Sequence, residues 1–269
     1  MIRIDQFLCI LLFIFSQTQA QESSRKYYTA CDIVYENGTI INGYLKDFGS
    51  KTVELNGIND FNTIENRFEM DRDEFTYRKD FNIEPRIIKS DSIKRIVAYM
   101  GSGNDTIIYD KVFTKTINIK NEIVDLNKRV FLPLLRKGKL DFYGYSYDNL
   151  DGPFKTKMFM GYIKRPDDNF VIKTLDFNRL NLINAWSLED RIYIAFITLT
   201  TDCEAYQNFM KEKFDKMKNN SKEYKKEQKE ILKKYAATHD VSKNKNVFFT
   251  DYLRDMQIES IIEYENLCK

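Results

Sequence analysis

The sequence predicts an α+β protein: an antiparallel β-rich N-terminal body, arranged as a meander, a sandwich or an open barrel, followed by a C-terminal α-helical subdomain. Three observations support this prediction. Short runs rich in Ile, Val, Thr, Phe and Tyr, separated by Gly, Asn and Asp, fill residues 21–185. No long helical period interrupts these runs, which argues against a parallel βαβ arrangement. From 186 to 269, apolar residues recur at spacings of three and four, as on one face of a helix.

The first element, residues 1–20, is typical of a secretory signal peptide. Residues 7–15 are apolar, and a polar stretch then ends in small side chains at Thr18 and Ala20. This apolar run is too short for a permanent anchor, since a helix needs about 20 residues to cross a bilayer. We expect cleavage near Ala20-Gln21 and export to the periplasm, the cell envelope or the extracellular space. The alternative is a buried N-terminal strand or helix.

The β-rich body, residues 21–185, begins with the clearest turn signal of the chain. Both residues of Asn37-Gly38 accept positive φ, and they separate two β-like runs at 31–35 and 40–45, which predicts a hairpin. The stretch 37–45 resembles the start of an Sm-like or SH3-like barrel. Further strands are expected at 52–55, 68–77, 87–99, 106–109, 112–119, 130–135, 140–147 and 157–164.

The helical subdomain, residues 186–269, follows. A polar stretch at 219–221 separates two amphipathic patterns, and Ser221 is a suitable N-cap for the second of them. No segment after the leader is long and apolar enough to span a membrane. Helices are expected at 189–199, 204–217, 222–237 and 250–267.

Composition indicates a packed protein without a global electrostatic preference. The chain is 43% hydrophobic, with 20 Phe and 17 Tyr, which is ample for a core. Its 42 Lys and Arg and 40 Asp and Glu leave a net charge of +2. Such a balance provides no field that would steer the protein to nucleic acid, and no nucleic-acid partner is expected.

Cleavage of the leader would leave three cysteines, Cys31, Cys203 and Cys268. In an oxidising compartment one pair is expected, with the third thiol free or intermolecular, and three pairings are possible. We favour a Cys203–Cys268 disulfide because each cysteine lies in a helical-looking segment of the C-terminal third. Closing that loop would stabilise the fold by about 4 kcal/mol in the chain-entropy model. The alternative is three reduced, buried thiols.

No catalytic residue, cofactor site or metal site is predicted. The one histidine, His239, precedes Asp240 in a polar stretch, without a Gly-x-Ser-x-Gly element to suggest a nucleophile. A zinc site lacks support because there is no Cys-x-x-Cys pair. Acidic clusters at 71–74 and 148–151 are more typical of a strand edge and a turn than of a Ca²⁺ site.

Two stretches are candidates for ligand contact. Lys137 and Lys139 precede Tyr143 and Tyr145, and this mixture of cations and aromatic rings on a sheet face would stack on bases or sugars. Export favours a glycan; the alternative is a set of core aromatic pairs. Residues 211–234 hold ten lysines and five acids, which suits either an anionic surface or a solvated helix face.

Several of these features together resemble a group of uncharacterised secreted proteins of Bacteroidota. The shared features are the leader ending in Gln-Ala-Gln, the Asn37-Gly38 hairpin, residues 135–143, and the pairing of 201–203 with 262–268. The resemblance implies a β-rich body with C-terminal cysteine-bearing helices, and it implies no activity.

Two functions are compatible with these observations. The first is a non-catalytic envelope or secreted protein that binds a glycan, an envelope protein or an anionic surface. The alternative is an extracytoplasmic hydrolase that uses dispersed carboxylates, since no local arrangement singles out one catalytic pair.

Overall fold

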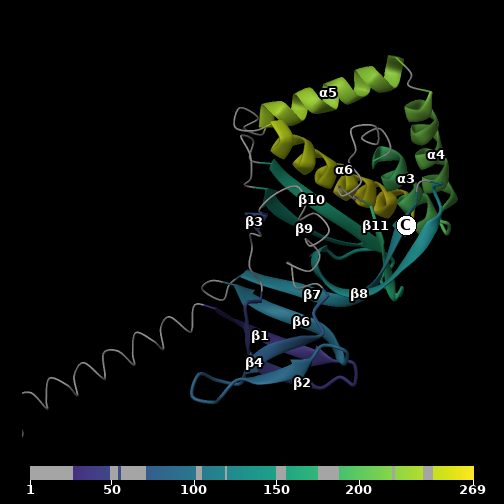
Figure 1. Ribbon diagram of the computed structural model, residues 1–269. Helices are drawn as coiled ribbons and strands as arrows, with labels where there is room; N and C mark the ends of the chain where they lie inside the picture. Colours follow the sequence, from purple (N-terminus) through teal and green to yellow (C-terminus); the bar gives the residue numbers. More distant parts are fainter. Residues whose placement is uncertain are drawn as a thin grey trace, which may run out of the picture. The chain divides into compact units, whose positions relative to one another are not determined.

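The computed structural model describes residues 27–48, 54–55, 71–100, 105–118, 120–149, 156–174, 188–219, 222–238 and 245–269 (Figure 1). The α+β prediction is confirmed, with strands first and helices last. The chain forms two compact units. The first comprises Met1–Ser50 and Arg72–Tyr109, and the second comprises Lys51–Asp71 and Asp110–Lys269. The predicted leader lies outside the described residues.

The first unit is an antiparallel meander whose last strand returns beside the first. The strand order is β6-β1-β2-β4-β5, and all four pairings are antiparallel. The run expected as one strand at 87–99 is two strands, because the chain turns at Ser90, whose carbonyl accepts from the Ile93 N–H at 2.9 Å. The strands are β1 (Tyr28–Tyr35), β2 (Ile40–Lys46), β4 (Glu74–Arg78), β5 (Arg86–Lys89) and β6 (Ile93–Met100).

The predicted hairpin joins β1 to β2. Gly38 has a φ of 83°, and its N–H donates to the Tyr35 carbonyl at 3.0 Å. The Asn37 side chain accepts from the Thr39 N–H at 3.0 Å. Side chains then alternate along both strands. One face is the core of the unit, with Cys31, Ile33, Leu45, Phe75, Tyr77, Ile96 and Ala98 buried.

Five strands of the second unit close into a ring. Neighbouring strands run in the order β11-β10-β9-β8-β7, and the first three of these pairs are antiparallel. Strand β11 also pairs in parallel with β7, whose residues from Asp110 onward belong to the second unit. The two strands expected at 106–109 and 112–119 are one strand, β7, and the short β11 was not predicted. The strands are β7 (Asp105–Ile117), β8 (Ile123–Arg136), β9 (Asp141–Asn149), β10 (Thr156–Lys164) and β11 (Phe170–Lys173), with β3 (Glu54–Leu55) beside β9.

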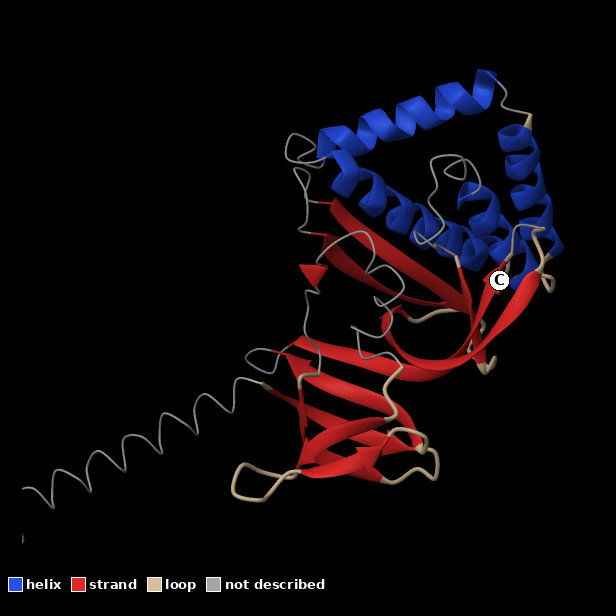
Figure 2. Cartoon of the chain, viewed as in Figure 1, coloured by secondary structure: helices blue, strands red, loops and turns tan. Residues whose placement is uncertain are grey.

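Four described helices cover this ring from one side (Figure 2). The last of them runs along β10, where Gly161 permits the approach: a Cβ there would lie 2.9 Å from Thr174 Oγ1 and 3.0 Å from Gln257 Oε1. None of the helices in the described ranges is long and apolar enough to cross a membrane. The helices are α3 (Leu188–Leu199), α4 (Glu204–Lys218), α5 (Lys222–Thr238) and α6 (Lys245–Leu267).

The compact units divide the chain at other places than the predicted boundary between 185 and 186. The reason is the packing of the helices on strands of the second unit. Leu253 and Ile261 of α6 are fully buried in the same hydrophobic cluster as Phe142 and Ile163 of the ring. The helices therefore contribute to the core of the second unit.

Candidate functional site

A groove of about 860 Å³ opens on the first unit. That volume lies within the range of about 300–1,000 Å³ that is usual for small-ligand pockets. Strands β1, β2, β4, β5 and β6 and the loop after β4 supply its walls. Its lining includes Ala30, Asp32, Asn42, Tyr44, Tyr77, Lys79, Glu84, Arg86 and Tyr99.

Strand register explains the hollow at the centre of this groove. Ala30 on β1 lies opposite Tyr44 on β2 and opposite Tyr99 on β6. Paired residues of neighbouring strands point to the same face, so one small side chain stands between two tyrosines. Asp32 follows on the same face, opposite Asn42. The sheet thus presents a shallow floor at Ala30 with an aromatic ring on each side.

The Asp32 carboxylate is held by two donors. Asn42 Nδ2 donates to Asp32 Oδ1 at 2.7 Å, and the Tyr99 hydroxyl donates to Asp32 Oδ2 at 2.6 Å. The hydrogen bond to this carboxylate raises the pKa of Tyr99, and partial burial adds to the effect. A carboxylate has about four lone-pair sites, so Asp32 keeps acceptor capacity for a ligand while its orientation is fixed.

Tyr77 borders the groove from the buried face of the sheet, and Gly43 makes room for it. A Cβ at Gly43 would lie 2.5 Å from the Tyr77 ring and 2.3 Å from the Arg78 carbonyl oxygen, which no real side chain tolerates. The Tyr77 hydroxyl donates to the Asn42 carbonyl at 2.8 Å. The guanidinium carbon of Arg86 lies 5.2 Å from the centre of the Tyr77 ring. Burial raises the pKa of Tyr77, although the charge of Arg86 opposes the shift.

Cys31 also borders the groove, but its thiol belongs to the core. The residue is 2% exposed and forms no disulfide. Burial, together with the charge of Asp32, raises the pKa of this thiol to about 12. Because the thiolate is the nucleophile, a thiol that stays protonated at neutral pH is chemically inert.

The residues predicted as ligand contacts lie in the second unit and do not share one exposed surface. Tyr143 and Tyr145 are 1% and 7% exposed, and Phe142 on the opposite side of β9 is also fully buried, so both sides of this strand are packed. The Tyr143 hydroxyl donates to Asp110 Oδ2 at 2.9 Å. Lys137 and Lys139 are exposed. Contact of these four residues with a ligand stays a prediction.

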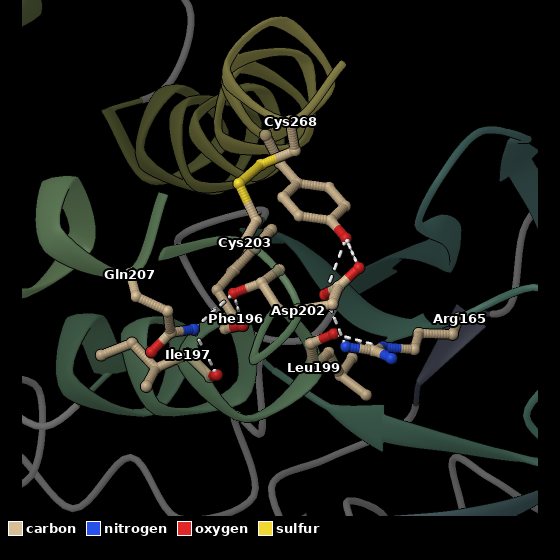
Figure 3. A network of polar contacts seen from close by, with 10 residues as sticks. Arg165, Phe196, Ile197, Leu199, Asp202, Cys203, Gln207 and Cys268 are labelled. Atoms are coloured by element: carbon tan, nitrogen blue, oxygen red, sulfur yellow. Dashed lines mark hydrogen bonds and ion pairs between the residues drawn. A yellow bond between two sulfur atoms is a disulfide. The ribbon is translucent and has the colours of Figure 1, made fainter. Parts of the chain in front are cut away.

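The predicted Cys203–Cys268 disulfide is present, with 5.8 Å between the two Cα atoms (Figure 3). A polar network surrounds it. Asp202 accepts from Arg165 Nη2 at 2.6 Å and from the Tyr264 hydroxyl at 2.9 Å. Burial and the bond to Asp202 raise the pKa of Tyr264 to about 12. These groups pair with one another, so the network holds the end of α6 in place.

A second network fixes the same helix end from β8. Arg136 donates to both carboxylate oxygens of Glu265, at 2.8 and 2.6 Å. The Lys139 N–H donates to Glu265 at 3.2 Å, and the Lys139 ammonium donates to the Cys268 carbonyl. The bond from Arg136 holds the pKa of Glu265 below its ordinary value, although partial burial opposes the shift. Together with the disulfide, these contacts form a clamp at the end of α6.

A smaller hollow of about 370 Å³ lies on the second unit. Its charged and aromatic groups contact one another: Lys115 Nζ lies 4.2 Å from the centre of the Phe170 ring and 3.7 Å from Asp125. It presents less surface for a ligand than the groove of the first unit does.

The basic segment at 211–234 forms α4 and α5. Several α4 lysines have contacts: Lys216 pairs with Glu212 at 3.0 Å, and Lys213 and Lys218 lie over aromatic rings. Lysines at 222, 225, 226, 229 and 233 of α5 are exposed. This arrangement is that of a solvated helix surface, and contact with an anionic surface stays a prediction.

Metal and histidine chemistry find no site in the described ranges. No group of three or more His, Cys, Asp or Glu side chains there is placed to hold a metal ion. His239 lies outside the described residues, as does part of the acidic cluster at 148–151. Asp71 of the other cluster pairs with Lys128 at 3.2 Å.

Comparison of the chain with protein-family models, with curated proteins and with solved structures finds no match in any of the three. The resemblance to secreted proteins of Bacteroidota stays a prediction, as does the signal peptide. The groove of the first unit is therefore interpreted from its own geometry.

Proposed function

We propose that this chain is an exported, non-catalytic binding protein whose ligand occupies the groove of the first unit. The observation that carries the proposal is the hollow above Ala30, between Tyr44 and Tyr99, with the Asp32 carboxylate oriented beside it. The apolar leader at 1–20 supports export.

The chemistry of the groove suits recognition. It offers aromatic faces, a fixed carboxylate acceptor and the Asn42 side chain, all of them on strands. Groups on strands are positioned more rigidly than groups on loops, and rigid groups lose less entropy when a ligand binds. The Cys31 thiol at the border remains protonated at neutral pH, and so supplies no nucleophile there.

One observation keeps the hydrolase as a second candidate. Asp32 and Glu84 both line the groove, and a pair of carboxylates is the usual equipment of glycoside hydrolysis. In a hydrolase one of the two would act as general acid or base, and its replacement by the amide would abolish turnover while a bound substrate is still recognised.

A ligand screen tests the proposal when each hit is repeated with a variant whose groove is filled by a larger side chain. The purified secreted chain is screened by thermal shift against peptides, nucleotides and oligosaccharides, and each hit is repeated with Ala30→Trp. The control is Ile87→Trp, because Ile87 is 57% exposed on β5 and lies outside the groove lining. We expect the hit to be lost in Ala30→Trp and kept in the control.

Two results separate the alternatives. A ligand that binds both tryptophan variants equally would contradict the groove as the site. Release of product from a bound oligosaccharide, lost in Asp32→Asn or Glu84→Gln, would instead establish the hydrolase. The mass of the secreted form tests export independently, since cleavage near Ala20-Gln21 removes the leader.

A further inference from the structure

We infer that the ligand of this groove is a neutral saccharide, with a sugar ring against Tyr44 and Tyr99 and its hydroxyls on Asp32 and Asn42. This inference rests on the proposed function and specifies the ligand class. Four features of the groove lead to it: its charge balance, its rings, its fixed acceptor and its place in the sheet.

Charge balance is the first feature. The charged side chains of the lining are two acids, Asp32 and Glu84, and two bases, Lys79 and Arg86. A lining with equal numbers of each sign has no net field to concentrate a polyanion or a polycation. Arg86 is in addition engaged over the Tyr77 ring. A nucleic acid, which is bound largely through its phosphates, would require an excess of cations.

The aromatic rings are the second feature. Tyr44 packs on Phe81, with 4.6 Å between the ring centres, and Phe81 packs edge-on against Tyr28 at 5.8 Å. These contacts hold the Tyr44 ring in place. Tyr99 is fixed at its hydroxyl by Asp32. Strands β2 and β6 lie two strand spacings apart, about 10 Å. A sugar ring presents apolar C–H groups to such aromatic faces.

The fixed acceptor is the third feature. Sugar hydroxyls donate and accept, so they require oriented partners of both kinds. Asp32 supplies charged acceptor sites, and Asn42 supplies an amide on the neighbouring strand at the paired position. Hydrogen bonds to a charged group are the stronger ones. Asp32 is therefore the residue that recognises the sugar hydroxyls, and Tyr99 both contacts the sugar ring and positions the Asp32 carboxylate.

The place of the groove in the sheet is the fourth feature. Ala30 and Asp32 lie on β1, which is paired on both sides, by β2 and by β6. A peptide in extended form binds by adding a strand at a free sheet edge, and β1 has none. Residues 40–43 of β2 also line the groove, and in the described part of the chain they pair with β1 alone, so extended peptides are a comparison arm of the test below. The exposed atoms at this position are side chains on the face of the sheet, which suits a ligand that stacks and forms hydrogen bonds.

Titration of the full secreted chain tests the inference. The probes are neutral oligosaccharides of glucose, mannose, galactose, xylose and N-acetylglucosamine, with oligouronates and extended peptides as comparison arms, measured by calorimetry and by ligand-observed NMR. We expect at least one neutral oligosaccharide to bind, with an affinity that does not change with salt concentration.

The variants separate the roles of the residues. Asp32→Asn should weaken binding by about ten- to a hundredfold, the loss of a hydrogen bond to a charged group. Tyr99→Phe keeps the ring and removes the donor that positions Asp32, so we expect a smaller loss, about two- to tenfold. Ile87→Ala, on an exposed strand position outside the lining, should leave the affinity unchanged.

The outcomes distinguish this inference from the proposal beneath it. One contrary outcome is that a peptide or an oligouronate binds the parent chain in place of a neutral saccharide. If that binding is lost in Ala30→Trp, the neutral saccharide is wrong as the ligand class, and the groove is still the site. A neutral saccharide that binds with equal affinity to Asp32→Asn and Tyr44→Ala would overturn the placement of the ligand. Failure of every neutral oligosaccharide to bind would overturn the inference outright.

Discussion

The two units use their cysteines and their polar side chains in opposite ways. In the second unit, Cys203 and Cys268 are joined, Arg136 pairs with Glu265, and Asp202 pairs with Arg165. In the first unit, Cys31 remains a buried thiol, and the Asp32 carboxylate is oriented at the wall of an open groove.

This difference indicates a division of work within one chain. Polar groups that satisfy each other stabilise a structure, whereas a polar group that is oriented and still accessible is available to a ligand. The clamp at the end of α6 therefore stabilises the second unit, and the groove of the first unit is the part available to bind a ligand.

Loss of the disulfide should have the largest effect. Replacing both Cys203 and Cys268 by serine releases a loop with a sequence separation of 65 residues. We expect the free energy of unfolding of the second unit to fall by about 2–4 kcal/mol, because the unfolded chain regains entropy. Hydrogen exchange measured by mass spectrometry resolves the two units. Equal deprotection of β1, β2 and α6 would contradict the division.

Gly43→Ala should destabilise the first unit by about 1–3 kcal/mol, the usual cost of overpacking. The added methyl would meet the Tyr77 ring and the Arg78 carbonyl, and one of them must move. Denaturant unfolding gives the size of the effect. Gly161→Ala provides a matched comparison in the second unit, where the neighbours are the ends of the Thr174 and Gln257 side chains. The outcome that would refute this view is a Gly43→Ala protein as stable as the parent.

Acid should weaken the clamp at the end of α6. The folded pKa of Glu265 lies below its ordinary value of 4.5 because Arg136 favours the carboxylate. This pair thus contributes its stability at a pH above 4.5 and loses it as the pH falls through the lower folded pKa. Unfolding measured across acidic pH should show a steeper loss than Glu265→Gln shows. Parallel profiles for the two proteins would mean that the pair does not contribute.

Cys31 should be unreactive in the folded protein. This prediction involves the smallest effect, because labelling the native protein requires no change in its stability. With a thiol pKa of about 12, almost no thiolate exists near neutral pH. Iodoacetamide labelling followed by mass spectrometry should modify Cys31 only after unfolding in denaturant. Rapid labelling of the native protein would show that the first unit opens far more readily than its packing implies.

The hairpin shows how far the sequence predicts the site. Asn37-Gly38 correctly predicts a turn, but the common reading of such a pair is a two-residue loop. In the structure Val34 pairs with Ile40, and the Tyr35 N–H donates to the Thr39 carbonyl, so the loop is longer. A one-residue change of register moves every side chain to the other face. The pairing of Asp32 with Asn42 could therefore not be derived from sequence.

Tyr143 and Tyr145 show the opposite case. Their alternation correctly predicts a strand, and residues two apart in a strand share a face. Both faces of β9 are buried, with Phe142 on one and Tyr143 on the other, by strands and helices far away in sequence such as β10 and α6. The same alternation is present in Ala30 and Asp32, where the outward face is the accessible one. Periodicity identifies the two faces of a strand, but only the packed structure shows whether a given face is buried or accessible.

The most direct test of the groove as the ligand site is an NMR titration of the isotopically labelled, secreted chain with the ligand that the screen identifies. We expect the largest changes in amide chemical shift on β1, β2 and β6, around Ala30, Asp32, Asn42, Tyr44 and Tyr99. Changes confined to the second unit, for instance around Lys137 and Lys139, would contradict this expectation.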